Sequence, residues 1–247
     1  MPKVFQYTGK DNLETMGVAV KYNDHLGFLV RREIPPSVGA VPSVLDFGAG
    51  MGVTSDLLRT HGIGVSCLEP DDEFRSDLAD RGYPVFKDVS DIEESSYDLI
   101  YLLNVLEHIE DDALMVKRLN AILKPGGRLL VYVPAFQFLY SSRDRKVGHY
   151  CRYRRGRLRS LAQAAGMEIN RLEYCDPLGF FAAIAYRLRD HGDGRLSEAK
   201  VRFFDKYLFP LSPPLQPLLR RVLGKNVLLV ATKPGGTGHE AVERRAT

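Results

Sequence analysis

The stretch that decides the fold is Val44-Leu45-Asp46-Phe47-Gly48-Ala49-Gly50-Met51-Gly52, which runs on into Val53-Thr54-Ser55. An apolar pair, an acid and three alternate glycines predict a strand that ends in a tight turn, with a helix directly behind it. Glycines let backbone N–H groups approach a ligand without a Cβ in the way, and the start of the helix adds partial positive charge. The stretch therefore predicts a ligand cradle at the carboxyl end of a strand.

Length and composition indicate one large domain, or one domain with an insertion. The chain has 247 residues, and its formal net charge of +3 is too small to indicate nucleic-acid binding by itself. The three cysteines, Cys67, Cys151 and Cys175, form no CxxC pair and are odd in number, which favours a reduced, cytoplasmic compartment. The N-terminus has no apolar signal core, and no apolar run approaches the roughly 18 residues of a membrane span.

Alternating strands and helices are expected on both sides of the glycine turn. A helix is predicted over about 13–33, before Pro35-Pro36, and 1–41 is expected to form an N-terminal segment that covers the bound ligand. The domain itself is expected over 42–233, with an irregular insert at 176–224 and a disordered tail at 234–247. The predicted strands are 44–47, 65–68, 84–86, 97–103, 128–134, 167–174 and 226–232, and the further helices are 54–61, 71–81, 111–123 and 157–165.

Two acids stand at predicted strand ends downstream of the glycines. Glu69 lies 17 residues after Gly52, near the roughly 20-residue spacing at which an acid meets ribose hydroxyls; the alternative is a loop acid that faces water. Asp88 could accept a hydrogen bond from an adenine amino group, or cap a turn. Val53 occupies the place where the dinucleotide fingerprint GxGxxG has its third glycine, which argues against pyrophosphate binding.

Two histidines are candidates for chemistry. His149 lies between a predicted strand and the next helix, on the ligand side of the sheet, where it could act as a base, bind the substrate or order its loop. His108 ends the pattern Asn104-x-x-Glu107-His108 and could contact substrate or orient a helix. A metal site from Glu107 and His108 is also conceivable, but adjacent residues need not point the same way, and no metal is expected.

A basic stretch at 143–159 holds eight basic residues against the single acid Asp144. It could be a solvated face, a grip for a substrate carboxylate or phosphate, or an RNA-binding surface. The insert at 176–224 could form a lid or a dimer surface. Its apolar runs 178–186 and 207–211 could pack against the domain, line an apolar acceptor pocket, or contact a membrane, with arginines near lipid head groups. Those arginines are Arg187, Arg189, Arg220 and Arg221.

Several motifs together resemble a known family. VLDFGAGMGVTS, the strand-end Glu69, YDLIYLLNVLEHIEDD, LKPGGRLLVYVP and the final VLLVATKP are similar to class I S-adenosylmethionine-dependent methyltransferases. The resemblance covers about 42–175 and 226–232. It implies an α/β, Rossmann-like fold with a seven-stranded sheet in the order 3-2-1-4-5-7-6, strand 7 antiparallel, and helices on both faces. Gly148–Tyr153 is similar to a GHYRRY-type segment of bacterial small-molecule methyltransferases, except that Cys151 replaces an arginine.

The resemblance implies S-adenosylmethionine as methyl donor and S-adenosylhomocysteine as product. The residues that would contact the methyl donor are Tyr22, Asp46, Gly48, Ala49, Gly50, Gly52, Glu69, Pro70, Asp88, Val89, Asn104 and Val105. Those expected at the acceptor are Arg143, Tyr150, Arg152 and Tyr153, with His149 and His108 as candidate catalytic groups. The expected acceptor is a small molecule (a sugar, a lipid-linked intermediate or a secondary metabolite), apolar or anionic and methylated on oxygen rather than nitrogen. No nucleic-acid partner is expected, and the expected protein is a monomer or homodimer. An RNA methyltransferase and a non-catalytic cofactor-binding module remain alternatives.

Overall fold

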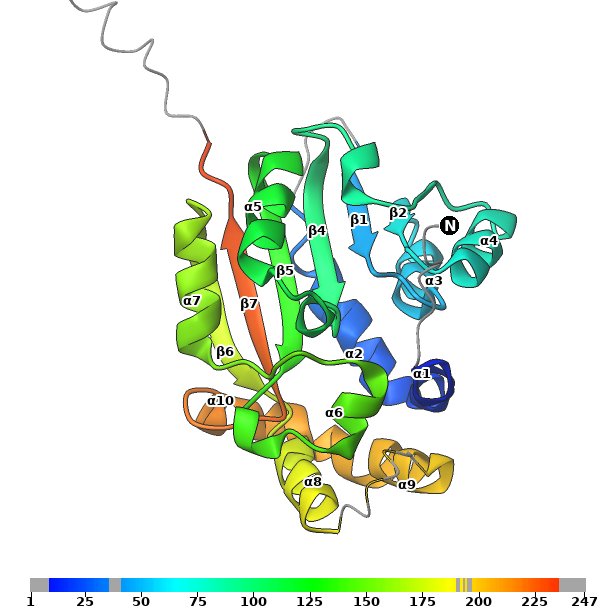
Figure 1. Cartoon of the computed structure of the whole chain (residues 1–247), viewed down its shortest axis with the longest axis vertical. Coiled ribbons are helices and arrows are strands. Elements are labelled where there is room, and N and C mark those ends of the chain that lie inside the picture. The colour runs from blue at the N-terminus through cyan, green and yellow to red at the C-terminus, as the bar shows by residue number, and fades with distance from the viewer. Residues whose placement is uncertain (1–8, 36–40, 190–191, 193, 195–196, 236–247) are drawn as a thin grey trace, which may run out of the picture.

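The computed structural model describes residues 9–35, 41–189, 192, 194 and 197–235. Its centre is a seven-stranded sheet in the order β3-β2-β1-β4-β5-β7-β6 (Figure 1). The first five strands in this order run parallel, and β7 is antiparallel to both β5 and β6. This confirms the predicted sheet. The strands are β1 Val44–Phe47, β2 Val65–Leu68, β3 Val85–Phe86, β4 Tyr97–Leu103, β5 Leu123–Pro134, β6 Glu168–Cys175 and β7 Asn226–Thr232.

Helices cover both faces of the sheet because its central strands are apolar on both sides. On one face pack α5 (Asp112–Ile122) and α7 (Arg155–Ala164), through residues such as Leu119 and Leu158. On the other face lie α2 (Val20–Arg31), α3 (Val53–Thr60) and α4 (Asp72–Asp80). The arrowheads of β1, β4 and β5 point toward the side of the molecule that carries α1, α6 and the insert helices (Figure 1). The carboxyl ends of the parallel strands therefore face these segments.

The N-terminal segment differs from its prediction. The single helix expected over 13–33 is two helices, α1 (Lys10–Gly17) and α2. Ala19 has a non-helical ψ of 72°, and the helical hydrogen-bond ladder is interrupted where Gly17 ends α1. The break allows α1 to turn away from α2 and to reach the ligand side of the sheet.

The insert between β6 and β7 is helical, so the expectation of an irregular segment was wrong. It contains α8 (Pro177–Leu188), α9 (Glu198–Phe203) and α10 (Ser212–Leu219). The insert contains several prolines, and they lie mostly in first turns, where a missing N–H costs little; Pro217, inside α10, is the exception. Asp205 of this insert accepts hydrogen bonds from the backbone N–H of Lys21 at 3.1 Å and of Tyr22 at 2.9 Å. The insert therefore holds the start of α2.

Two other boundaries differ from the predictions. The Lys124–Gly127 segment, expected to separate α5 from the next strand, is the first part of β5, whose pairing with β4 begins with Tyr97 opposite Leu123. The tail expected to be disordered from residue 234 lies outside the described residues, apart from Pro234 and Gly235.

Among the helices that the structure describes, none is both long enough and apolar enough to span a membrane.

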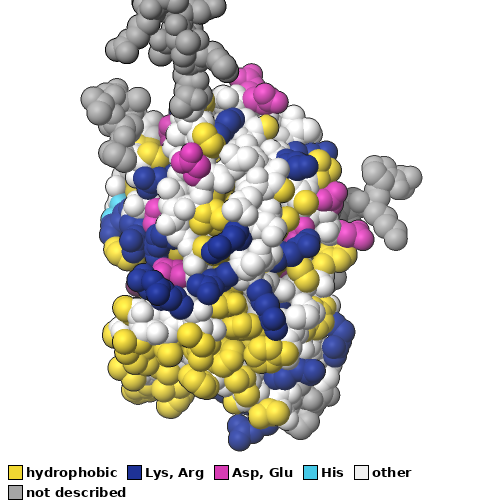
Figure 2. Space-filling view, turned by 90° about the vertical axis from the view of Figure 1, so that its left-hand side faces the viewer, with side chains coloured by type: hydrophobic (Ala, Val, Ile, Leu, Met, Phe, Trp, Pro, Cys, Tyr) yellow, Lys and Arg dark blue, Asp and Glu magenta, His cyan; other side chains and the backbone are white. Residues whose placement is uncertain are grey.

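One face of the molecule carries a broad apolar area below a band of lysine and arginine side chains (Figure 2). The insert contributes most of the exposed large apolar side chains outside the core, among them Leu218 at 78% exposure and Leu188 at 81%. A globular domain does not need this surface for folding. The exposed large apolar residues of the insert are Phe181, Leu188, Phe203, Tyr207, Leu208, Leu211, Leu215, Leu218 and Val222.

Candidate active site

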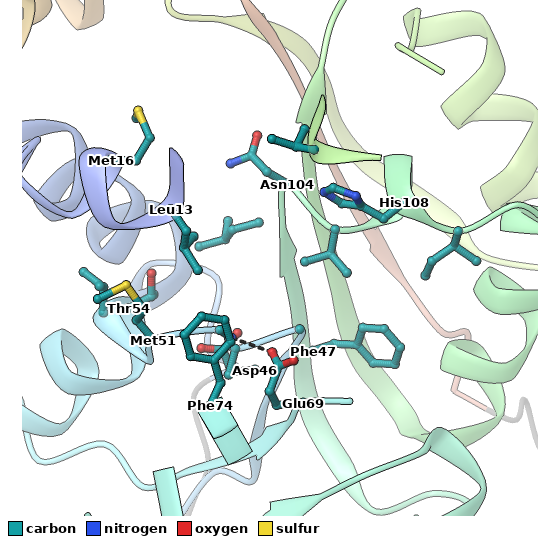
Figure 3. Close-up of a pocket in the computed structure, with 18 of the residues that line it drawn as sticks. Leu13, Met16, Asp46, Phe47, Met51, Thr54, Glu69, Phe74, Asn104 and His108 are labelled. Carbon is teal, nitrogen blue, oxygen red and sulfur yellow. Dashed lines mark hydrogen bonds between the residues drawn. The ribbon is translucent and has the colours of Figure 1, made fainter. Parts of the chain in front are cut away.

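A cavity of about 530 Å³ opens at the carboxyl ends of the parallel strands. In open α/β sheets this is the edge at which ligands bind. Leu13 and Met16 of α1 lie on one side of the cavity, Asn104 and His108 on the opposite side, and Asp46, Glu69 and Phe74 at its base (Figure 3). The cavity thus joins segments from the start of the chain, from the ends of the five parallel strands, from α6 (Ser142–Val147) and from the start of β7.

The glycine turn forms one wall of the cavity. Gly48, Gly50 and Gly52 have φ values of 77°, 52° and 73°, which side chains of L-residues rarely tolerate. A Cβ on Gly48 would lie 2.6 Å from a Val105 methyl group, and one on Gly50 would lie 3.1 Å from Leu13. The missing Cβ atoms of Gly48 and Gly50 therefore let Val105 and Leu13 lie close against the turn. Gly52 does not line the cavity; a Cβ there would lie 2.7 Å from Leu78.

Glu69 is fixed beside this turn. One carboxylate oxygen accepts a hydrogen bond from Gly50 N–H at 2.7 Å, and the other accepts one from Asp71 N–H at 2.9 Å. Its side chain is 5% exposed, and burial raises its pKa. A carboxylate held in this way keeps lone pairs for two hydroxyl donors. Pro70 follows it on the cavity wall, and Phe74 lies nearby.

Asp46 also lines the cavity, below the glycine turn. It accepts a hydrogen bond from Ser55 Oγ at 2.7 Å, and burial raises its pKa to about 6. A nearby positive charge would lower that pKa. Asp46 therefore suits a ligand that carries a positively charged group.

The wall opposite the glycine turn comes from the end of β4. Asn104 has a φ of 57°, in the left-handed region where asparagine is tolerated better than most residues. Its backbone N–H donates to the Tyr132 carbonyl at 2.7 Å, and its side-chain oxygen accepts from Asn226 Nδ2 at 3.1 Å. Val105 follows and contacts the glycine turn. Two neighbouring strands thus fix the position of Asn104.

The other residues that were predicted to contact the methyl donor also line the cavity. Val89 and Asp88 line it at the end of β3, where Asp88 caps a short 3-10 turn by accepting hydrogen bonds from the Ser90 N–H and hydroxyl. The capping role considered for Asp88 is therefore present. Ala49 and Tyr22 line the cavity as well, and the Tyr22 ring lies 5.3 Å from the Lys225 ammonium group.

A second group of polar side chains lies past Asn104. Asp144 accepts hydrogen bonds from His149 Nδ1 at 2.8 Å and from Arg152 Nε and Nη2, both at 2.9 Å. The His149 and His108 rings meet edge to face, with centroids 4.6 Å apart. Burial lowers the pKa of both imidazoles, that of His108 to about 4, although the Asp144 carboxylate opposes the shift at His149. Both rings line the cavity and are mainly neutral near pH 7.

Glu107 lies behind these imidazoles and is 0% exposed. Neither of its carboxylate oxygens has a hydrogen-bond partner among the described residues. Burial raises its pKa to about 8. The sequence pattern Asn-x-x-Glu-His had pointed to this segment, but it could not show that His149 would meet it.

Two cations line the same end of the cavity. Arg143, on α6, and Lys225, just before β7, are cavity-lining, and neither forms an ion pair with any residue that the structure describes. Burial lowers the pKa of Lys225 to about 8, an effect that the nearby Asp176 opposes. Of the four predicted acceptor residues, Arg143 and Arg152 reach the cavity.

Tyr150 and Tyr153 do not reach the cavity. Tyr150 is 58% exposed and points to the surface, whereas Tyr153 is 1% exposed in the core beneath α5. The Tyr153 hydroxyl donates to Asp112 at 3.0 Å and to the Leu106 carbonyl at 3.2 Å. The expectation that these tyrosines contact the acceptor is therefore corrected: alternate residues of an extended segment point in opposite directions, and the fold buries one of them.

Several lining residues were not identified from the sequence. Leu13 and Met16 were assigned to a long helix, and Asp144 was counted only as an acid within a basic stretch. Lys225 lies just before the last strand and Asn226 begins it, 120 residues or more after Asn104 and Val105. For Lys225 and Asn226, the only sequence signal for a place in the site was that they are polar residues directly before an apolar run.

Comparison with known proteins identifies the family. The model of a methyltransferase domain matches residues 21–172, so the chain belongs to this family. Its sheet order is that of class I S-adenosylmethionine-dependent methyltransferases, and the domain belongs to that class.

Two of the curated relatives are named ubiquinone biosynthesis O-methyltransferase. The one from Coxiella burnetii is 30% identical over 95 residues, 35% of this chain and 41% of the relative. The one from Xylella fastidiosa is 33% identical over 98 residues, which are 36% of this chain and 40% of the relative. The matches thus span about two fifths of these relatives.

Solved structures share the fold at low sequence identity. A putative methyltransferase of Haloferax volcanii, in complex with the Trm112 activator, has a TM-score of 0.60 at 17% identity, covering 95% of this chain and 100% of that chain. A second structure is phosphoethanolamine N-methyltransferase 2 of Haemonchus contortus in complex with phosphomonomethylethanolamine and S-adenosylhomocysteine. It has a TM-score of 0.61 at 17% identity, and the match covers 95% of this chain and 61% of that chain. These likenesses concern the fold alone.

Proposed function

We propose that this protein transfers a methyl group from S-adenosylmethionine to a hydroxyl oxygen of a small molecule. The observation that carries the proposal is one continuous cavity that joins two unlike ends. The glycine turn and Glu69 form one end, and the His149–Asp144 pair forms the other, with Asn104 and Val105 between them. A transfer reaction between two small molecules needs such an arrangement, because both must be held in line at once.

The residues at the first end fit the methyl donor. The backbone of Gly48 and Gly50 borders the place proposed for the methionine part, and Asp46 suits its charged amino group. Glu69 offers its carboxylate to a ribose diol, and Asp88 with Val89 borders the place for adenine. Leu13, Met16 and Tyr22 cover this end, which supports the proposal that 1–41 covers the cofactor.

Residues at the other end prepare the acceptor. In the reaction a bond forms from the acceptor oxygen to the methyl carbon, the carbon–sulfur bond breaks with its electron pair going to sulfur, and the hydroxyl proton passes to the neutral imidazole of His149, which acts as the base. We place His149 at that oxygen because Asp144 holds its Nδ1 and leaves Nε2 toward Glu107 and the cavity. His108 contacts the His149 ring and lines the same space. Oxygen is favoured over nitrogen because a hydroxyl acceptor needs its proton removed or its pKa lowered.

The acceptor is proposed to carry an anionic group. Arg143 and Lys225 bring two positive charges to the acceptor end, and placing partly buried cations there without an ion-pair partner among the described residues is costly unless a ligand pairs with them. A carboxylate or phosphate on the acceptor would supply that partner. Against the RNA alternative, the arginines of 143–159 do not form one open face, because Arg152 and Arg157 are paired with Asp144 and Asp112.

The first test is ligand-dependent stability. S-adenosylhomocysteine is expected to raise the melting temperature of the protein, and NAD is expected to leave it unchanged; the reverse result contradicts the proposal. Turnover is then measured with labelled S-adenosylmethionine and hydroxylated acceptors offered as carboxylates and as their neutral amides. Transfer to the carboxylate forms supports the anionic acceptor. Cofactor binding without turnover on any acceptor supports the non-catalytic alternative.

A further inference from the structure

The buried carboxylate of Glu107 is the polar group that the proposed reaction leaves unexplained. Both of its oxygens are shielded from water and have no hydrogen-bond partner among the described residues. Such a group costs about 1–3 kcal/mol or more unless something pairs with it. Its neighbours are two imidazole rings that face the cavity. A partner that suits a carboxylate and two imidazoles together is a metal cation.

The distances among the three side chains fit such a partner. One ligand atom each from Glu107, His108 and His149 lies within 4.8 Å of the others, and His149 Nε2 is 3.8 Å from Glu107 Oε1. Tetrahedral ligands at about 2.0–2.2 Å from a metal are about 3.4 Å apart. The three atoms would therefore have to approach one another by at most about 1.4 Å to surround one ion.

Neighbouring groups orient both imidazoles. Asp144 accepts the hydrogen bond of His149 Nδ1, which leaves Nε2 with its lone pair, and Arg152 with the Ser141 N–H holds the carboxylate of Asp144 in place. The His108 ring hydrogen-bonds to the backbone at Val147 and Gly148. Histidines that bind metals usually have their second ring nitrogen held by a carboxylate or a backbone carbonyl.

We propose that Glu107, His108 and His149 bind one divalent first-row transition metal ion, such as Zn²⁺. Two imidazoles and one carboxylate favour such an ion over Mg²⁺ or Ca²⁺. Glu107 approaches from the protein interior, whereas the two histidines line the cavity. Three protein ligands leave a coordination position open toward the acceptor. On the proposed function, an acceptor hydroxyl would take that position, where the ion would lower its pKa so that its proton passes to water before methyl transfer. His149 then acts as a ligand and not as the base.

The test uses untagged protein and does not depend on turnover. Chelator-treated protein is titrated with Co²⁺, and visible absorption is expected to show one ion bound in a four- or five-coordinate site; competition with Zn²⁺ gives its affinity. Glu107→Gln is nearly the same shape and is expected to weaken binding at least a hundredfold. Glu110→Gln changes an exposed carboxylate three residues away and is expected to leave affinity unchanged.

Each outcome decides the inference separately from the proposed function. Absence of bound Co²⁺ in the wild-type protein overturns the metal site, whether or not the variant folds. Equal affinity of wild type and Glu107→Gln overturns it as well. S-adenosylhomocysteine binding is measured in parallel and does not require the metal; if it persists while no metal binds, the methyltransferase proposal stands and His149 returns to the role of base.

A different observation, the exposed apolar area of the insert, carries a second inference. Helices α8 and α10 pack together, and Leu188, Leu211, Leu215, Leu218 and Val222 on and around them are exposed. Arg187, Arg189, Arg220 and Arg221 stand beside these side chains in the sequence, and all four are exposed. Apolar side chains next to a basic rim are the combination that binds an anionic lipid surface.

We infer that this face, made of those five apolar residues and four arginines, docks on a membrane that contains anionic lipid. A protein partner is less favoured because all four charged residues that flank the apolar side chains are arginines. A rim that is only positive matches the uniformly negative surface of an anionic membrane. Binding is expected to depend on both components, apolar insertion and charge, and to weaken with rising salt.

Cosedimentation with vesicles tests this inference. The protein is expected to bind vesicles of phosphatidylcholine with phosphatidylglycerol and not those of phosphatidylcholine alone. The double variant Leu215→Asp/Leu218→Asp is expected to lose at least tenfold in affinity, whereas Leu114→Asp, at an exposed leucine of α5, is expected to retain it. Failure to bind anionic vesicles, equal binding by both variants, or a dimer in solution that Leu215→Asp/Leu218→Asp dissociates would each overturn it.

Discussion

The two ends of the cavity are built in different ways. At the methyl-donor end, the glycine turn, Asp46 and Glu69 come from adjacent β–α units: Asp46 lies near the carboxyl end of β1, the glycine turn follows β1 directly, and Glu69 follows β2 directly. At the acceptor end, Glu107, His149 and Lys225 come from segments far apart in the sequence, and their contacts cross the molecule. The first end is a local property of short segments, whereas the second depends on how α6 and β7 pack. Substitutions should therefore act locally at one end and through neighbouring groups at the other.

The largest expected effect concerns the glycine turn. Gly48→Val is expected to weaken S-adenosylhomocysteine binding about a thousandfold, ~4 kcal/mol, because its Cβ would lie 2.6 Å from Val105 at a φ of 77°. The affinity is measured by isothermal titration calorimetry. Gly62→Ala is the control, since Gly62 has a φ of 74° with nothing near its Cβ. If both variants lose affinity equally, backbone strain and not the close approach explains the loss.

The next effect is the pH dependence of stability from Asp46. Burial raises its pKa to about 6 in the folded protein, so its protonated form favours folding at low pH, and this contribution is lost as the pH rises through about 6. Between about pH 4 and pH 8 it amounts to about 2–3 kcal/mol. Asp46→Asn is expected to remove this loss, so that the variant gains stability relative to wild type at the higher pH. Urea unfolding of the ligand-free proteins measures the difference. A constant difference at all pH values contradicts the raised pKa.

A smaller effect is expected at Glu69 and separates the two ends directly. Glu69→Gln keeps one oxygen acceptor but loses the charge, and is expected to weaken S-adenosylhomocysteine binding about tenfold to thirtyfold. His149→Ala is expected to leave that affinity within twofold while it lowers turnover. Equal losses of cofactor affinity in the two variants would show that the cavity does not divide into a donor end and an acceptor end.

The smallest effect concerns the two tyrosines that the fold removes from the acceptor end. Tyr153→Phe is expected to lower the free energy of unfolding by ~1 kcal/mol, because its hydroxyl bonds Asp112 and the Leu106 carbonyl. Tyr150→Phe, at an exposed side chain, is expected to change it by less than about 0.5 kcal/mol. Neither should change the KM for the acceptor. A higher KM in either variant would return that tyrosine to the substrate site.

The sequence by itself determined the strands of the sheet and the strand-end residues that are proposed to bind the methyl donor. Apolar runs followed by Gly48, Glu69 and Asn104 indicated strand ends, and parallel strands place their carboxyl ends on one edge, so residues at those ends had to meet. The same local rules failed for α1 and for the insert. A break of the helix after Gly17 and a helical insert rich in prolines depend on packing, and Asp205 holds the start of α2 from nearly two hundred residues away.

Only the tertiary structure decided the acceptor end. The sequence placed Glu107 and His108 side by side, but it did not indicate that His149 would join them. The loop after α6 brings His149 there, and the Tyr150 N–H next to it donates to the Glu107 carbonyl at 2.8 Å. The sequence also presented Tyr150, Arg152 and Tyr153 as equals, although one faces solvent, one binds Asp144 and one lies in the core. Strand-end positions follow from backbone periodicity. Side-chain clusters between distant segments follow from packing, which no local pattern encodes.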